Sequence, residues 1–426
     1  MSIYPRFKFT RGLHGFGLIS HYHRLRSLAS SHLPTSISPS RILPFRNIST
    51  TKTSPRVHIL GLGSIGTFVA HALAETPERP LVTLLLHRAS LGEAYMRNGK
   101  EIVLETREGQ SITYTGYDLE VLHDTKWYTM DPASYAPGTL HTQQYSRYPI
   151  DEFISNLIVC VKSTQTVAAL RPLIPRLSRT STVVFLQNGA GMIEDANTHL
   201  WPDPSLRPTY ITGVISHGVT LNGPFNITHT GVAATSIGPV PREEDVTSDP
   251  HASRPSSASP SYLLDTLPLA PILNCQTYAW PAILQLQLEK LATNAFSNPL
   301  CALADATTAY LFDIPEACRA LMQEISSVIL ALPELQGIPG AKERFSAKTL
   351  EETVMGIVDR NRATTTSMVW DLRRGRETEV RYINGYWARR GREVGLRTPL
   401  NEELVRKVEE RCRAVRKVGD RRYSTS

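Results

Sequence analysis

The sequence predicts an α/β fold in which an N-terminal domain built on a parallel sheet is followed by an all-helical C-terminal domain. Continuous apolar runs alternate with helical patterns after residue 55, and from Pro281 onward the pattern is helical almost to the end. Strands that read as continuous apolar runs are typical of parallel sheets covered by helices on both faces. We therefore expect domains at residues 55–279 and 280–426.

The first strand and helix lie in RVHILGLGSIGTFVAHALAE, where a glycine-rich turn joins them. In a GxGxxG turn of this kind, the first glycine permits the tight turn, the second lets the backbone approach a pyrophosphate, and the third allows close helix packing. The helix N-terminus then offers its N–H groups to the phosphates. The N-terminal domain is thus predicted to be Rossmann-like and dinucleotide-binding. The predicted cofactor-binding residues are Gly61, Leu62, Gly63, Ser64, Ile65 and Gly66.

The second apolar run, PLVTLLLHR, ends in His87 and Arg88. An acidic residue about 20 residues after the glycines would accept the adenosine ribose hydroxyls and favour NAD. A guanidinium at this place can pair with a 2′-phosphate and stack on adenine. Arg88 therefore favours NADP as the cofactor, with an ordinary exposed loop arginine as the alternative.

Two later apolar runs, NLIVCVKS and STVVFLQNGAG, also end in polar residues, and the helical segment TVAALRPLIPRL lies between them. In an open α/β sheet the ligand crevice lies at the carboxyl ends of the strands. Lys162 and Asn188 are therefore candidates for contact with cofactor or substrate. Lys162 could instead merely cap its strand, and Asn188 could serve only its own glycine turn.

The remaining part of the first domain is predicted to contain edge strands and two insertions. Residues 209–240 are rich in Thr, Val, Gly and Asn and are expected to add strands at the far edge of the sheet. PILNCQTYAW is expected to be one more strand. Residues 118–150 are polar and aromatic, and WYTMDPASYAPGTLHTQQYSRYP within them shows neither helical nor strand periodicity. Residues 241–262 are rich in Pro and Ser. Both segments are predicted to be surface loops, and the second is predicted to be disordered. An interdomain linker is the alternative for the second segment.

In the helical domain, the stretch LEKLATNAFSNPL places Lys290, Asn294 and Asn298 on one side of a helix. A solvated helix face is the alternative to a binding site. Reduction of a ketone requires a hydride and a proton, and a lysine at the carbonyl oxygen can stabilise the developing charge and supply that proton. Partial desolvation would lower the pKa of such a lysine towards working pH. The two amides could hold substrate oxygens.

The formal net charge of +7 comes from the N-terminal segment, because the first 56 residues hold nine of the 46 basic residues and no acidic one. The remaining chain is close to neutral, which gives no support to a nucleic-acid partner. Residues 1–54 are rich in Arg and Ser, as mitochondrial transit peptides are, so we expect import into the matrix. A disordered basic arm and a secretory signal are the alternatives.

The five cysteines are far apart, with no CxxC pair and no clustered histidines. A disulfide framework or a zinc site is therefore not expected, and no metal is predicted. No window approaches 18 uninterrupted apolar residues, so no transmembrane helix is predicted either.

Five motifs in order resemble the ketopantoate reductases, the 2-dehydropantoate 2-reductases of pantothenate biosynthesis. They are GLGSIG, VKSTQT, LQNGAG, EKLATNAFSNPL and SMVWDLRRGRETEVRYING, and the resemblance runs from about residue 56 to about residue 415. The last two motifs are much more specific than the glycine loop. The resemblance also implies the same pairing of a Rossmann-like domain with an all-helical domain.

The resemblance implies a role for each matching residue. It makes Lys290 the proton donor and Glu379 the acidic residue that fixes the substrate hydroxyl and assists the lysine. It assigns Asn294 and Asn298 to substrate contact, Ser367 to the substrate carboxylate, Asn188 and Lys162 to the active site and cofactor, and Arg88 to the 2′-phosphate, with Gly61, Gly63 and Gly66 cradling the pyrophosphate.

The residues alone leave other interpretations of the carboxylates open. Glu379 and Asp371 could be surface groups paired with neighbouring arginines, and Asp371 is expected to orient a turn or an arginine. The sequence departs from the family pattern at Leu288, where a tryptophan is frequent, and at Thr364, where an asparagine is frequent. These departures put the substrate's identity in more doubt than the reaction type.

The predicted function is NADPH-dependent reduction of 2-dehydropantoate to (R)-pantoate. One alternative is a reductase of another 2-oxo acid, and the other is a non-catalytic mitochondrial paralogue that acts as a binding scaffold. Retention of Lys290, Asn294, Ser367 and Glu379 favours the enzyme, because a scaffold has no need of that set. The expected partner is a small 2-oxo acid, and a homodimer formed through the helical domain is left open.

Overall fold

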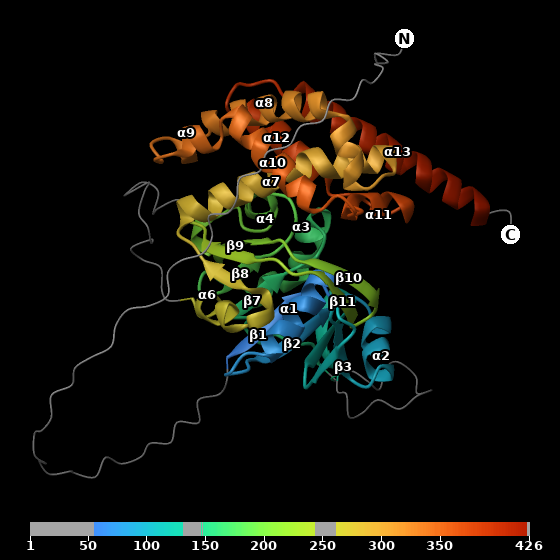
Figure 1. The fold of residues 1–426 in the computed structure, drawn as a ribbon. Helices are drawn as coiled ribbons and strands as arrows, with labels where there is room; N and C mark the ends of the chain where they lie inside the picture. The colour runs from blue at the N-terminus through green and yellow to red at the C-terminus, as the bar shows by residue number, and fades with distance from the viewer. Residues whose placement is uncertain (1–54, 131–145, 147, 243–260, 424–426) are drawn as a thin grey trace, which may run out of the picture. The chain divides into compact units, whose positions relative to one another are not determined.

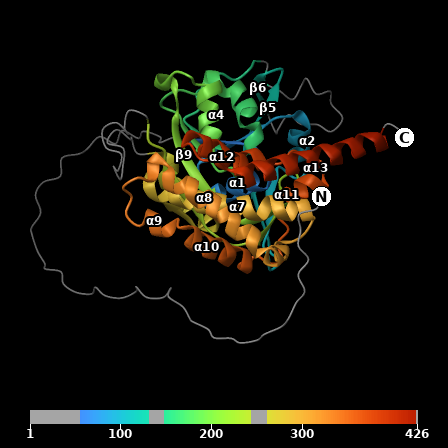
Figure 2. The same cartoon turned by 90° about the horizontal axis from the view of Figure 1, so that it is seen from above.

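The computed structural model describes residues 55–130, 146, 148–242 and 261–423, with side-chain environments given up to residue 417. The predicted transit peptide, residues 1–54, lies outside the described residues. So does most of the predicted loop at residues 241–262. The described residues belong to one compact unit, Thr53–Ser426. Within it the strands come first, and the helices from α7 onward gather at one end of the sheet (Figure 1, Figure 2).

The main sheet has nine strands in the order β13-β12-β9-β8-β7-β1-β2-β5-β6. Its strands are β1 (Arg56–Leu60), β2 (Leu81–Leu86), β5 (Asp118–His123), β6 (Lys126–Met130), β7 (Asn156–Val159), β8 (Thr182–Phe185), β9 (Thr209–Ile215), β12 (Thr235–Pro239) and β13 (Cys275–Thr277). The strands from β9 to β5 run parallel, and β12 and β6 pair antiparallel with their inner neighbours. The strand order reverses between β1 and β7, the place where such sheets form a ligand crevice.

A second, four-stranded sheet corrects part of the prediction for residues 209–240. It has the order β10-β11-β3-β4, with β3 (Glu101–Glu105), β4 (Ser111–Thr115), β10 (Gly218–Gly223) and β11 (Asn226–Gly231). Only β9 and β12 extend the far edge of the main sheet as expected. The hairpin β10–β11 joins β3 instead, a segment for which no element was predicted. This pairing is between distant segments, so local periodicity does not reveal it.

The predicted loop at residues 118–150 is wrong over its first part, which forms the hairpin β5–β6. Leu119 and Val121 point into the core, and β5 pairs in parallel with β2. The turn at Asp124 and Thr125 takes positive φ angles at both residues, the conformation of a tight hairpin turn. Its polar residues Asp118, Glu120 and His123 interrupt the apolar pattern, so the composition of the segment does not reveal a strand. Residues 131–145 and 147 lie outside the described residues.

The helices that flank the sheets include two that were predicted and three that were not. The predicted helix in TVAALRPLIPRL is α-helical only over its first five residues and continues as a 3₁₀ helix, Arg171–Arg176, with Pro175 inside it. The α-helices of this part are α1 (Ser64–Ala74), α2 (Ala89–Arg97), α3 (Thr166–Leu170), α4 (Met192–His199) and α6 (Tyr262–Thr266). No helix was predicted for α2, α4 or α6.

The helical region follows β13, and the described residues after Trp280 contain no strand, as expected. Its helices are α7 (Trp280–Ala304), α8 (Pro315–Ala331), α9 (Ala341–Arg344), α10 (Ala347–Arg360), α11 (Ser367–Arg373), α12 (Val380–Glu393) and α13 (Pro399–Tyr423). In Figure 1, α7 lies next to the sheet and α8 lies farther away. None of the helices in the described part of the chain is both long and apolar enough to cross a bilayer.

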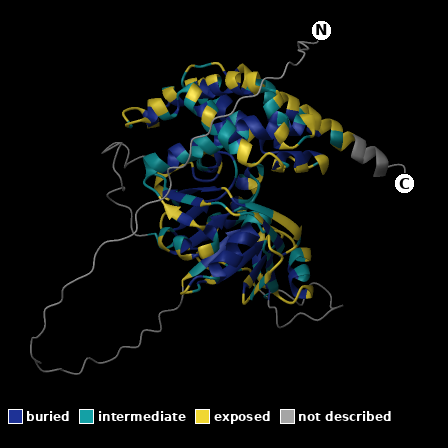
Figure 3. Ribbon diagram, in the orientation of Figure 1, coloured by how far each residue is buried: buried dark blue, intermediate teal, exposed yellow. Residues whose placement is uncertain are grey.

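Three buried hydrophobic clusters support this arrangement. Alternate residues of the central strands, such as Ile158 and its neighbours Leu157 and Val159, belong to clusters on opposite faces of the main sheet. This alternation follows from the period of two in a β-strand, and it explains why the strands read as continuous apolar runs. The third cluster lies among the helices after β13. Figure 3 shows the buried strands and the exposed outer surfaces of the helices.

Candidate active site

The glycine loop between β1 and α1 has the geometry that a dinucleotide requires. Gly61 has a φ of +102°, and a Cβ built there would lie 2.5 Å from the backbone nitrogen of Val161. A Cβ at Gly66 would overlap the carbonyl oxygen of Gly61. At Gly63, by contrast, a Cβ would meet no atom within 4 Å. Gly61 and Gly66 are therefore required by protein packing, whereas Gly63 leaves open space where a ligand can approach.

The first turn of α1 is also free to bind an anion. Gly63 is its N-cap and provides no side-chain cap, so the first N–H groups of the helix have no side-chain acceptor from that residue. Leu62 and Ile65 pack their side chains against the core beneath the loop. The residues present thus fit a pyrophosphate bound by backbone groups.

Arg88 lies at the same edge of the sheet, because β2 is parallel to β1 and pairs Leu85 with Leu60. Its side chain is exposed, and the residue is the N-cap of α2. This is the position at which a group that distinguishes the adenosine ribose has to lie.

Lys162 follows β7 and brings the sheet and the helical region together. Its Nζ lies 2.8 Å from Oδ2 of Asp371 in α11 and 3.5 Å from Oε2 of Glu379, the N-cap of α12. Both carboxylates are buried. Burial disfavours the charge of Lys162, but the two carboxylates outweigh it and raise the pKa of this lysine above its ordinary value.

The interpretation of Asp371 as a partner of a turn or a nearby arginine is wrong, since its carboxylate binds Lys162. Glu379 is likewise no surface carboxylate paired with neighbouring arginines. Its Oε1 accepts hydrogen bonds from the backbone N–H of Ser163 at 3.0 Å and from the Ser163 hydroxyl at 3.1 Å. Ser163 was not predicted as a site residue, although it directly follows Lys162 in the motif VKS.

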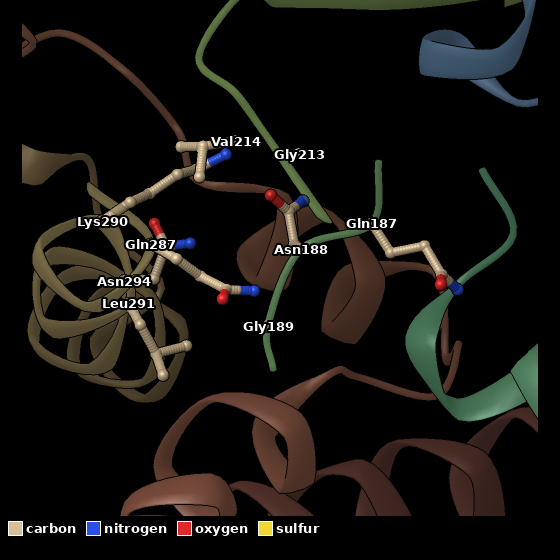
Figure 4. Close-up of a pocket in the computed structure, with 9 residues that line it drawn as sticks. All are labelled: Gln187, Asn188, Gly189, Gly213, Val214, Gln287, Lys290, Leu291 and Asn294. Carbon is tan, nitrogen blue, oxygen red and sulfur yellow. The ribbon is translucent and has the colours of Figure 1, made fainter. Parts of the chain in front are cut away.

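A small pocket lies between α7, the loop after β8 and the end of β9. It brings together Lys290, Asn294 and Asn188, which the sequence predicted as site residues. It is lined by Gln187, Asn188, Gly189, Gly213, Val214, Gln287, Lys290, Leu291 and Asn294. Figure 4 shows Lys290 and Asn294 projecting from α7 towards the loop of Asn188, while Gln187 points away from α7.

The amides in this pocket are available to a ligand. Among the residues that the structure describes, the side chains of Asn188 and Asn294 have no hydrogen-bond partner. Gln187 is engaged instead, with its Nε2 donating at 2.8 Å both to the carbonyl of Val161 and to the hydroxyl of Thr166. Gln187 therefore fixes the start of the loop, and Asn188 is left to face the pocket.

The environment of Lys290 brings its pKa closer to neutral pH. Its ammonium donates to the backbone carbonyl of Ile215 at the end of β9, which is a neutral acceptor. Burial lowers the pKa of Lys290 to about 8, and the negative charge of Glu379 opposes that change. A lysine with this pKa can deliver and recover a proton at working pH.

Two predicted substrate residues lie elsewhere. Asn298 is buried one turn beyond Asn294 and is not among the residues lining the pocket, and its Oδ1 accepts a 3.4 Å hydrogen bond from Ser297. Ser367 is exposed at the start of α11, also outside this lining. It precedes Asp371 by one turn and so lies on the same side of the helix.

The two departures from the family pattern have ordinary surroundings. Leu288 is 1 % exposed and packs within the helical core, so it does not line the pocket. Thr364 is exposed, and its carbonyl accepts a 3.0 Å hydrogen bond from the N–H of Thr308.

A dinucleotide-type glycine loop at the switch point of a parallel sheet is the arrangement of the Rossmann-like dinucleotide-binding domains. Two family models define this class further. The ketopantoate reductase PanE/ApbA model matches residues 57–242, and the ketopantoate reductase PanE/ApbA C-terminal model matches residues 282–411. The chain belongs to the ketopantoate reductase family, which confirms the resemblance seen in the sequence and the predicted fold class.

Individual relatives carry more than one substrate name. The chain is 27 % identical over 357 residues to a probable 2-dehydropantoate 2-reductase of Schizosaccharomyces pombe, covering 82 % of this chain and 94 % of the relative. It is also 27 % identical over 372 residues to a ketoisovalerate reductase of Gibberella fujikuroi, covering 79 % and 78 %. A ketopantoate reductase structure from Ralstonia eutropha shares the fold, with a TM-score of 0.59 at 21 % identity over 85 % of this chain and 99 % of that one.

Proposed function

We propose that the protein reduces 2-dehydropantoate to (R)-pantoate with NADPH, with Lys290 as the proton donor. The observation that carries this proposal is the pocket in which a lysine of lowered pKa lies beside the unpartnered amides of Asn188 and Asn294. A carbonyl oxygen that gains negative charge during reduction needs such a cation, and a substrate with several oxygens needs such amides.

Each residue of the candidate site has its own role in this proposed reaction. A bound NADPH supplies the hydride that reduces the carbonyl carbon. Lys290 donates its proton to the carbonyl oxygen and is afterwards reprotonated from water. Asn188 and Asn294 orient the substrate oxygens, while Glu379, held by Ser163 and Lys162, keeps a negative charge that favours the protonated form of Lys290.

The substrate is tested by NADPH oxidation with purified residues 55–426. 2-Dehydropantoate differs from ketoisovalerate by one hydroxymethyl group, so we expect the ratio of kcat/KM for these two acids to define the specificity. A ratio above roughly 10² in favour of 2-dehydropantoate supports the proposal, because losing a hydrogen-bonded hydroxyl leaves buried polar groups unpaired. A preference for ketoisovalerate or for an aromatic 2-oxo acid would contradict it.

Lys290→Ala tests the proton donor in the same assay. We expect kcat to fall by roughly 10² to 10⁴, the usual contribution of a general acid. Gln287→Ala is the matched control, since Gln287 lines the same pocket from the same helix but cannot donate a proton from a cationic group. Turnover that survives in Lys290→Ala as well as in the control would rule out this role.

The proposal also names NADP rather than NAD, with Arg88 as the contact for the 2′-phosphate. The exposed guanidinium at the end of β2 supports it. We expect Arg88→Ala to raise the Kd for NADPH by about 10-fold or more and to leave the Kd for NADH within about twofold, since one charge-assisted contact contributes roughly 1.5–3 kcal/mol. An equal increase in the Kd for NADPH and for NADH would show that Arg88 does not bind the 2′-phosphate.

We further propose that residues 1–54 direct the protein to mitochondria. Their content of arginine and serine without any acidic residue supports this location. The test compares a fluorescent fusion of the full chain with one of residues 55–426. We expect only the full chain to colocalise with a mitochondrial marker, and the same distribution for both would contradict the proposal.

A further inference from the structure

Asp195, in the first turn of α4, binds two side chains of α12. Its Oδ2 accepts a 2.7 Å hydrogen bond from the hydroxyl of Tyr382, and its Oδ1 accepts a 3.4 Å one from Nη1 of Arg389. Arg389 and Asp195 are both partly buried. Burial, and then the bond to Asp195, raise the pKa of Tyr382, so its hydroxyl remains a donor at working pH. One carboxylate therefore holds two positions of α12 that lie almost two turns apart.

The loop before α4 rests on the same surface of α12. The N–H of Ala190 donates to the carbonyl of Tyr382 at 2.9 Å. Gly189 has a φ of +92°, and a Cβ built there would lie 2.7 Å from that same carbonyl oxygen. A Cβ at Gly191 would overlap the guanidinium of Arg389. The two glycines thus let the loop backbone approach the helix closely.

Both sides of this contact carry a residue of the candidate active site. Asn188, which lines the pocket, directly precedes Gly189 in the loop. On the helix, the N–H of Tyr382 donates to the carbonyl of Glu379 at 2.9 Å, so Tyr382 closes the turn that begins at Glu379. A shift of Tyr382 relative to α4 would therefore move Asn188 and Glu379 relative to each other.

We propose that Asp195 is a positioning residue that acts through Tyr382 and Arg389 to fix the distance between Asn188 and Glu379. The consequence for reaction rate rests on the function proposed above, whereas the structural coupling does not. Asp195 touches neither the pocket nor the glycine loop. Its loss should therefore affect binding and turnover of the oxo acid more than binding of the cofactor.

Tyr382→Phe removes only the hydroxyl from this contact, and Tyr210→Phe is its matched control. Tyr210 also binds α4 by its hydroxyl, with a 2.8 Å hydrogen bond to Oδ1 of Asn197, and it touches neither α12 nor the loop at residues 187–191 through that group. We expect Tyr382→Phe to lower kcat/KM for the preferred 2-oxo acid by about 3- to 10-fold, the effect of one hydrogen bond. The control should change it by less than about twofold, and the Kd for NADPH should change by less than about twofold in both variants.

The conservative series at Asp195 separates positioning from general stability. The amide oxygen of Asp195→Asn can still accept from Tyr382, so this variant should recover part of the kcat/KM that Asp195→Ala loses. Equal kinetics for Asp195→Asn and Asp195→Ala, with equal losses of Tm, would overturn the proposal. So would a kcat/KM for Tyr382→Phe that matches that of the control.

Hydrogen–deuterium exchange tests the coupling without turnover. In Tyr382→Phe we expect faster exchange in peptides that cover residues 187–191 and 379–384, and no change there in Tyr210→Phe. If the wild-type protein reduces no 2-oxo acid, the proposed function fails and this measurement alone decides the coupling. Unchanged exchange in both peptides would overturn it.

Discussion

The side-chain amide of Asn384 donates a 2.9 Å hydrogen bond to the backbone carbonyl of Ala295. That carbonyl lies four residues before Pro299 in α7, and proline has no N–H to donate to it. Asn384 belongs to α12 and is completely buried, and it also donates to Oδ1 of Asn401 at 3.0 Å. A buried amide of one helix therefore replaces the missing donor of another, in the helix that also carries Lys290 and Asn294.

This relationship predicts a non-additive pair of substitutions. Asn384→Ala should destabilise the protein by about 1–3 kcal/mol, because it leaves the buried carbonyl of Ala295 without a partner. In the background of Pro299→Ala, where residue 299 regains an N–H, the same change should cost less by about 0.5–1.5 kcal/mol. Urea unfolding of the wild type, the two single variants and the double variant measures the difference between the two costs of Asn384→Ala. Equal costs in both backgrounds would show that the amide does not replace the helical donor.

The lowered pKa of Lys290 predicts the pH dependence of catalysis in both directions. Reduction requires the protonated amine, so kcat/KM for the 2-oxo acid should fall as the pH rises above about 8. Oxidation of the hydroxy acid requires the neutral amine and should rise over the same range. Lys290→Arg keeps the cation but holds its proton throughout the accessible pH range. The decrease in kcat/KM near pH 8, the alkaline limb of the pH profile, should therefore be absent from this variant. A limb that persists in Lys290→Arg would assign the titration to another group.

Replacing Glu379 should move this limb in a known direction. The negative charge of Glu379 raises the pKa of Lys290, against the larger effect of burial. In Glu379→Gln the charge is lost while the side chain keeps an oxygen that can accept from Ser163. The pKa of Lys290 should therefore fall, and the loss of reductase activity should begin at a lower pH than in the wild type. Full pH profiles of kcat/KM measure it, and a limb that moves to higher pH would contradict the sign.

The glycine loop predicts two alanine variants that behave differently. Gly66→Ala should lower Tm and cofactor binding together, because its Cβ would overlap the carbonyl oxygen of Gly61. Gly63→Ala should leave Tm unchanged or slightly raised, since its φ of −80° suits alanine and its Cβ meets no protein atom. Its Kd for NADPH should nevertheless rise by at least about 10-fold, because the methyl would occupy space next to the pyrophosphate. Thermal unfolding and fluorescence titration distinguish the two.

Segments with strong local patterns were predicted well from the sequence. β1, α1, β2, β7 and β8 lie where the apolar runs indicated, and the helical region begins at Trp280, next to the expected boundary. The predictions failed at strands whose own sequence pattern is weaker. β5 and β6 were taken for a loop, and β10 and β11 join a second sheet with β3 and β4. Such strands are only partly buried or carry polar residues, so neither composition nor periodicity marks them.

In the candidate site, too, the features that follow from local patterns were predicted, and the contacts between distant residues were not. The stripe of Lys290 and Asn294 follows from helical spacing, so its common direction could be predicted from the sequence alone. The partner of Asp371 could not, because Lys162 lies 209 positions away. The arginines next to Asp371 in DLRRGR were the nearer candidates in the sequence. Ser163 lies within the motif VKSTQT, but its two hydrogen bonds to Glu379 depend on how α12 meets the end of β7.

The sequence by itself determined the α/β class, the glycine loop, the family and the helix that presents Lys290, because each follows from motifs or patterns formed by neighbouring residues. The tertiary structure alone decided which charges meet. It placed Lys162 between Asp371 and Glu379, directed Lys290 to the neutral carbonyl of Ile215, and left Asn298 outside the pocket lining. Ionisation and hydrogen bonding depend on burial and on distances of a few ångströms between remote segments, which local sequence patterns do not specify.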